Sequence, residues 1–147
     1  MKDKIFLNIA KEIRKLSKDP STKVGAVIVS LEGYRVIAAG YNGLPSKYPD
    51  NYDNITRDEK NLISTHAEVN AILNAAKNGA ATKDCAIYVT ELPCAACASA
   101  IINSGIKKVV VPLKGSLDSK RWEKSCNLSL EVFETCGVEL VKITEDN

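Results

Sequence analysis

Three residues of this sequence have the types and the spacing that a zinc site needs. His66 is the single histidine of the chain, and two residues separate Cys94 from Cys97. Side chains three positions apart share one face of a helical turn, and the N-terminal end of a helix favours thiolates. Two thiolates and one imidazole suit Zn²⁺ and leave a fourth tetrahedral position open, which distinguishes a catalytic zinc ion from a structural one. The sequence therefore predicts a catalytic zinc ion bound by these three side chains.

An acid stands next to this predicted site. Glu68 follows His66 by two residues, so its carboxylate can lie beside the open position without binding the metal. A zinc ion lowers the pKa of a water molecule to about 7 in favourable sites, and a nearby carboxylate can move the released proton. We expect Glu68 to have this role. Two plainer interpretations stay open, because a lone Cys-x-x-Cys can be a redox pair or half of a structural zinc site, and a lone histidine is often structural.

The elements that must position these residues follow from hydrophobic periodicity and from turn residues. Helices are expected over residues 4–17, 65–79, 94–104 and 121–136, and strands over 24–30, 35–39, 85–90, 107–112 and 138–143. Residues 40–62 form a long polar segment without a clear period, with at most a helical turn beginning near residues 58–64. Both predicted metal-binding motifs therefore stand where a helix begins.

The order of these elements predicts the fold class. Strands that alternate with helices form an α/β protein, and the hairpin of the first two strands makes its sheet mixed. We expect a three-layer α/β/α sandwich around a five-stranded mixed sheet. The chain of 147 residues has the length of a single domain, 1–147.

Composition limits the classes of function. The chain has 20 Lys and Arg against 18 Asp and Glu, a net charge of +2, which gives no basic footprint for nucleic acid. Its apolar runs are too short for a membrane span, and its first residues do not resemble a signal peptide, so we expect a cytoplasmic protein without membrane contacts. Five cysteines in such a chain argue against a disulfide framework. Cys85, Cys126 and Cys136 are expected to be small buried residues.

Five segments resemble the deoxycytidylate (dCMP) deaminase family, in its phage and bacterial form. They are SKDPSTKVGAVIV at 17–29, GYNGLP at 40–45, HAEVNAI at 66–72, PCAACA at 93–98 and IINSGIK at 101–107. His-x-Glu followed by Pro-Cys-x-x-Cys is also the signature of zinc deaminases that act on cytosine or adenine. The resemblance extends over nearly the whole chain, and GYNG together with the Lys-Asp-Pro segment favours dCMP among the possible substrates.

The resemblance implies a cytidine deaminase-like fold and the hydrolysis of dCMP to dUMP and ammonia, which supplies thymidylate synthesis. It implies one catalytic zinc ion on His66, Cys94 and Cys97, with Glu68 as the proton carrier. Asn42 would contact the deoxyribose, and Ala67 would also bind substrate. Many members are hexamers activated by dCTP and inhibited by dTTP, with Mg²⁺ accompanying the triphosphate. Their effector site uses the loop that corresponds here to Gly40, Tyr41, Asn42 and Gly43.

Two further contacts follow from what a nucleotide needs. Arg121 could bind a phosphate in a bidentate manner, and Trp122 could stack on a base. The alternatives are a solvated arginine and a core tryptophan at the start of a helix. Lys23 is a weaker candidate for the phosphate, since a solvated lysine is the simpler interpretation.

Other functions stay open at this point. A deaminase that also accepts dCTP, and a tRNA or nucleoside deaminase, would carry the same zinc motif. A zinc-stabilised binding module is the non-enzymatic alternative. Glu68 speaks against it, because a structural zinc site needs no acid and normally has a fourth protein ligand.

Overall fold

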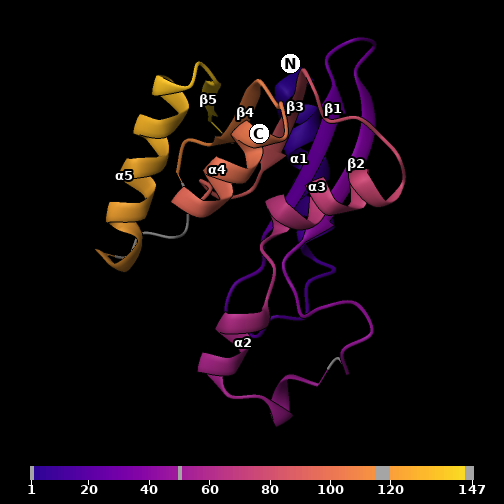
Figure 1. Ribbon diagram of the computed structural model, residues 1–147, viewed down its shortest axis with the longest axis vertical. Coiled ribbons are helices and arrows are strands. Elements are labelled where there is room, and N and C mark those ends of the chain that lie inside the picture. The colour runs from indigo at the N-terminus through magenta and orange to yellow at the C-terminus, as the bar shows by residue number, and fades with distance from the viewer. Residues whose placement is uncertain (1, 50, 115–119, 145–147) are drawn as a thin grey trace.

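The structure is a computed structural model that describes residues 2–49, 51–114 and 120–144, without the side chains of residues 120–122. Its strands are β1 (Gly25–Ser30), β2 (Arg35–Tyr41), β3 (Cys85–Val89), β4 (Lys108–Pro112) and β5 (Glu139–Ile143). Its helices are α1 (Lys2–Arg14), α2 (Arg57–Ile63), α3 (Ala67–Lys77), α4 (Ala95–Asn103) and α5 (Lys120–Thr135), with a short 3₁₀ turn at Tyr52–Asn54. Figure 1 shows their arrangement. Each predicted strand and helix is present within a few residues of its expected bounds.

The five strands form one mixed sheet in the order β2-β1-β3-β4-β5. Strand β1 is antiparallel to both of its neighbours, while β3, β4 and β5 run parallel to one another. The hairpin of β1 and β2 produces the antiparallel pair, and the crossover helices α4 and α5 produce the parallel ones. The predicted mixed sheet is confirmed.

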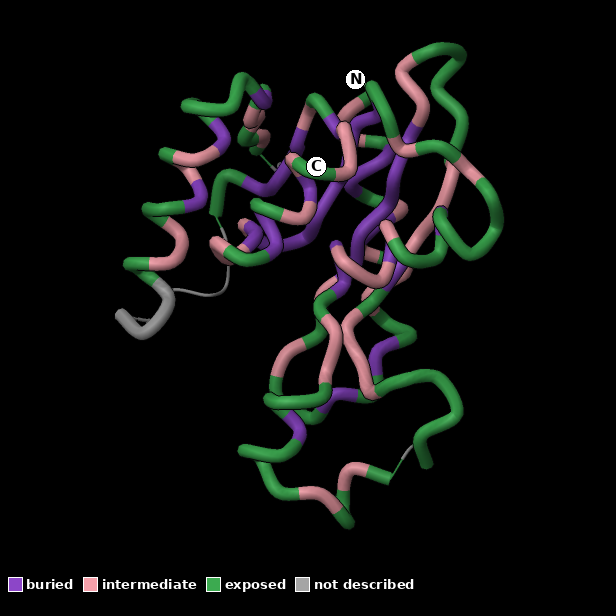
Figure 2. The backbone as a smooth tube through the Cα atoms, viewed as in Figure 1, coloured by how far each residue is buried: buried purple, intermediate pink, exposed green. Residues whose placement is uncertain are grey.

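Alternation along the strands divides the core into two clusters, one on each face of the sheet. On β1, Val27 and Val29 pack in the cluster that contains α1 residues, whereas Ala26 and Ile28 pack with residues of α3, α4 and α5. Successive side chains of a strand point to opposite faces, so each strand supplies both clusters. In Figure 2, β1, β3 and β4 are buried along most of their length, whereas α5 exposes part of its surface. The three-layer sandwich is therefore confirmed.

Residues 43–49 and 51–65 belong to an arm that extends away from the sheet (Figure 1). Its neck is closed where Gly43 pairs with Thr65, through backbone N···O distances of 3.2 and 2.9 Å. Inside the arm, α2 begins at a capping box: Glu59 N donates to Thr56 Oγ1, and Thr56 N donates to Glu59 Oε1. The sequence predicted no more than a helical turn here, because seven residues without an apolar stripe give no helical period. Among the described residues, no helix has the length and hydropathy needed to cross a bilayer.

Candidate active site

The three predicted metal ligands lie together. His66 Nδ1 lies 3.2 Å from Cys97 Sγ and 3.6 Å from Cys94 Sγ, and all three donor atoms fall within 4.8 Å of one another. A tetrahedral zinc ion, with Zn–N of about 2.1 Å and Zn–S of about 2.3 Å, separates such donors by roughly 3.6 Å. The donor types and their spacing therefore fit zinc.

Two helix N-termini bring these donors together. His66 is the N-cap of α3 and Cys94 is the N-cap of α4, and both have extended backbone angles. Neither side chain makes the usual capping hydrogen bond to its own helix. Each is therefore available to the other, and Cys97 joins them from the first turn of α4.

Hydrogen bonding within the cluster sets the charge of the sulfur atoms. Interactions with the Cys97 thiol and with His66 lower the pKa of Cys94 to about 4. The same pairing with Cys94, together with burial, raises the pKa of Cys97, and hydrogen bonding to Cys94 raises the pKa of His66. The cluster thus favours a thiolate at Cys94 that accepts hydrogen bonds from protonated Cys97 and His66. A metal cation would take the place of those protons, because metal binding releases protons from its ligands.

Glu68 is the buried acid of the site. Its side chain lies in the first turn of α3, and the residue is only 4% exposed. Burial raises the pKa of Glu68, against the opposing charge of His66. A carboxyl group whose pKa is raised suits general acid–base catalysis, because it can both accept and return a proton.

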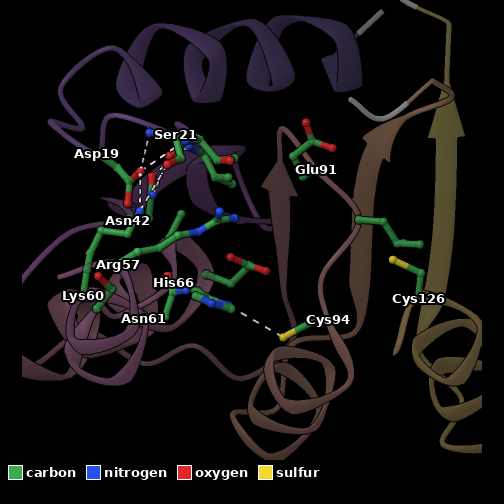
Figure 3. A pocket seen from close by; sticks show the side chains of 16 residues that line it. Asp19, Ser21, Asn42, Arg57, Lys60, Asn61, His66, Glu91, Cys94 and Cys126 are labelled. Carbon is green, nitrogen blue, oxygen red and sulfur yellow. Dashed lines mark hydrogen bonds and ion pairs between the residues drawn. The ribbon is translucent and has the colours of Figure 1, made fainter. Parts of the chain in front are cut away.

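A cavity of about 250 Å³ opens onto these residues. His66, Glu68 and Cys94 line it, as do Glu91 at the end of β3 and residues of the arm and of the 19–24 loop. In Figure 3, Cys94 and Cys126 lie on one side, and Asp19, Ser21, Arg57, Lys60 and Asn61 gather on the other. The volume is slightly below the range of about 300–1,000 Å³ that is typical of small-molecule sites.

Asn42 holds one wall of this cavity. Its Oδ1 accepts a hydrogen bond from Val24 N, and its Nδ2 donates to the carbonyl of Thr22, both at 2.8 Å. Asn42, Thr22 and Val24 all line the cavity. An amide group has two donors and two acceptor lone pairs, so Asn42 keeps capacity for a ligand while it fixes the loop.

The remaining predicted residues have different positions. Ala67 is fully buried and lines the cavity. Lys23 is exposed, and the cavity wall does not include it. The side chains of Arg121 and Trp122 lie outside the described residues, so their roles stay predictions.

The predicted effector loop, residues 40–43, borders both the sheet and the arm. Gly40 faces the backbone of α3, where a side chain would have no space. Tyr41 is 41% exposed, and its carbonyl accepts a hydrogen bond from Asn70 Nδ2. The loop ends at Gly43, in the neck of the arm.

Two features of the site have no counterpart in the roles that the sequence analysis assigned, although Asp19 belongs to the Lys-Asp-Pro segment that carries the family resemblance. Asp19 and Lys60 form a buried ion pair at the cavity wall, and Arg57 lines the same wall. Residues 19 and 60 are 41 positions apart, and no motif relates them. The expectation for the scattered cysteines was right for buried Cys85 but wrong for Cys136, which is exposed, while half-buried Cys126 lines the cavity.

The fold and the site define a class of metal-dependent hydrolases: imidazole and thiolate donors at two helix N-termini, next to a buried carboxylate. Comparisons with known proteins then identify the family. The family model described as "Cytidine and deoxycytidylate deaminase zinc-binding region" matches residues 1–113. The chain belongs to this family.

Individual relatives agree with the assignment. The deoxycytidylate deaminase of Mus musculus is 41% identical over 145 residues, covering 95% of this chain and 78% of the relative. A deaminase of the luxG 3′ region of Aliivibrio fischeri is 38% identical over 143 residues, covering 97% of this chain and 94% of the relative. The crystal structure of the cyanophage S-TIM5 dCMP deaminase in complex with dCMP and dUMP superposes with a TM-score of 0.78. It has 26% identity, covering 95% of this chain and 94% of that one.

Proposed function

We propose that this protein hydrolyses dCMP to dUMP and ammonia. The observation that carries the proposal is the cavity in which His66, Cys94 and the buried acid Glu68 face a common space. Relatives named deoxycytidylate deaminase, and a structural relative that binds dCMP and dUMP, support the choice of substrate.

His66, Cys94 and Cys97 would hold one zinc ion, which would supply Lewis-acid chemistry that makes a water molecule acidic near neutral pH. Glu68 accepts a proton from the attacking water and delivers it to N3 of the cytosine ring. The water oxygen bonds to C4, and Glu68 then transfers the remaining hydroxyl proton to the C4 amino group, so that the C4–N bond breaks, ammonia leaves and C4 becomes a carbonyl. The raised pKa of Glu68 suits this shuttle, because the carboxyl must be both base and acid in one turnover. Ala67 and Asn42, on the cavity wall, are the proposed contacts to the base and the deoxyribose.

The proposal extends to regulation and assembly. The resemblance supports a hexamer that dCTP with Mg²⁺ activates and dTTP inhibits through residues 40–43, in the service of thymidylate synthesis. Hydrogen bonds that link residues 40–43 to the cavity wall also support regulation through this loop. Asn42 belongs to this loop and holds Thr22 and Val24, so a nucleotide that moves the loop also moves the cavity wall.

Release of ammonia from dCMP, dCTP, deoxycytidine and CMP by the zinc-loaded protein tests the proposal. We expect the highest kcat/KM with dCMP, raised by dCTP and lowered by dTTP at sub-saturating substrate. Equal turnover of dCMP and dCTP would contradict the preference for dCMP and indicate a deaminase that accepts both nucleotides. An absence of turnover with all four, at one zinc ion per chain, would contradict the proposed reaction.

A further inference from the structure

Helix α2 turns its polar face toward the cavity. Arg57, Lys60, Asn61 and Ser64 all line the cavity, and their spacing of three, four and seven residues places them on one helical face. Leu62, on the same helix, is 84% exposed. An ordinary surface helix buries its apolar side chains and exposes its polar ones. The reversed arrangement indicates that this helix faces a polar ligand.

The two cations on this face differ in their partners. Lys60 Nζ lies 3.2 Å from Asp19 Oδ1, and both side chains are less than a tenth exposed, so its charge is already compensated. Arg57 has no ion-pair partner among the described residues, and its side chain extends into the cavity (Figure 3). Among the described residues, Arg57 therefore adds to this wall a positive charge that no ion pair compensates.

The side of the cavity away from α2 has an acidic side chain where the α2 side has basic ones. Glu91, just after β3, lines the cavity on that side and is only 5% exposed (Figure 3). Charges in a low-dielectric cavity act strongly on a ligand. An anionic group would therefore be less stable beside Glu91 than against α2.

A buried hydroxyl on the same face supports a ligand there. Ser64 Oγ is buried and has no hydrogen-bond partner in the described part of the chain. Buried polar atoms in folded proteins nearly always have a partner, since leaving one unpaired costs about 1–3 kcal/mol. Ser64 is two residues from His66, and Arg57 lies about 10 Å further along the helix axis. The face thus extends from the metal ligands toward the far end of the cavity.

We infer that Arg57 binds the 5′-phosphate of the nucleotide substrate, with Asn61 beside it and with the Asp19–Lys60 pair positioning α2 for this contact. The inference rests on the proposed function, and it assigns the preference for a nucleotide over a nucleoside to the arm. A guanidinium group suits this role, because its parallel N–H donors match two phosphate oxygens. Ser64 contacts the same nucleotide nearer its base.

The test replaces Arg57 by glutamine and compares dCMP with deoxycytidine, which lacks the phosphate. For Arg57→Gln, kcat/KM for dCMP falls about 10- to 100-fold, mainly through KM, and kcat/KM for deoxycytidine is unchanged. Arg35→Gln is the matched control, since Arg35 is exposed at the start of β2 and is not part of the cavity wall. It leaves both substrates unaffected. An equal loss with both substrates in Arg57→Gln, or no loss with dCMP, overturns the inference.

Calorimetric titration with dUMP and deoxyuridine separates this inference from the proposed reaction. Zinc-loaded protein binds dUMP more weakly in Arg57→Gln than in the wild type, by a similar 10- to 100-fold, while deoxyuridine binds both equally. Equal dUMP affinities overturn the phosphate assignment even where dCMP is turned over. If the wild-type protein shows no deaminase activity, the proposed reaction is contradicted. The dUMP titration tests the role of Arg57 even in that case.

Discussion

Replacement of Lys60 by methionine tests how much the ion pair between Lys60 of α2 and Asp19 of the 19–24 loop contributes to the free energy of unfolding. Lys60 and Asp19 are 8% and 7% exposed, and removal of one partner from a buried ion pair costs about 3–5 kcal/mol. Asp19 Oδ1 keeps its hydrogen bonds from Ser21 N and Thr22 N, at 2.8 and 3.1 Å, which continue to stabilise the carboxylate. We therefore expect the low end of the range, a loss of about 3 kcal/mol. At roughly 2–4 °C per kcal/mol for a chain of this size, Tm falls by about 10 °C.

Urea unfolding followed by circular dichroism, at one fixed protein concentration, measures this loss. Lys77→Met provides the matched control, because Lys77 is exposed at the end of α3 and has no ion pair among the described residues; its free energy of unfolding changes by less than about 0.5 kcal/mol. The double variant Asp19→Asn/Lys60→Met removes both charges and is expected to be more stable than Lys60→Met alone. A loss of under 1 kcal/mol in Lys60→Met would refute the reasoning, as would strictly additive effects of the two replacements.

Four further outcomes are expected. Glu68→Gln lowers kcat by about 10³-fold, measured as ammonia release, while metal analysis still finds one zinc ion per chain; a nearly wild-type kcat would exclude Glu68 as the proton carrier. Dipicolinate abolishes activity and lowers Tm, and Zn²⁺ but not Mg²⁺ restores both, because bound metal stabilises the folded state. Gly40→Ala costs about 2 kcal/mol or more in urea unfolding, since its Cβ would lie 2.7 Å from the carbonyl oxygen of Ala67, whereas Gly43→Ala, whose Cβ has space, costs little. Burial acts to raise the pKa of Asp19, but hydrogen bonds from Ser21, Thr22 and Lys60 hold it below its usual 3.8. The resulting stability is present above about pH 4 and is lost as the pH falls through the lower folded-state pKa, so between pH 6 and pH 3 the wild type loses more stability than Asp19→Asn.

The elements and the cluster of His66, Cys94 and Cys97 were predictable from the sequence, because both depend on local signals. Strand β1 contains the apolar run Ala26–Val29, and α4 begins just after Pro93 and Cys94, so short windows contain the information. His66 and the Cys-x-x-Cys pair were recognisable because zinc chemistry restricts residue types and spacing so strongly. The sequence also predicted that Glu68 lies beside this cluster, whereas the raised pKa of Glu68 follows from its burial in the structure.

The residues on the α2 side of the cavity come together only through long-range packing. The Asp19–Lys60 pair joins residues 41 positions apart, and Lys60 on a short polar helix looks like any solvated lysine until the arm folds back on the 19–24 loop. The orientation of α2, with Arg57 inward and Leu62 outward, contradicts the rule by which an amphipathic helix is interpreted from its sequence. A ligand site reverses that rule, since a cavity that receives a polar molecule needs polar side chains on its wall. Long-range contacts of this kind depend on how the elements pack, and no local pattern encodes them.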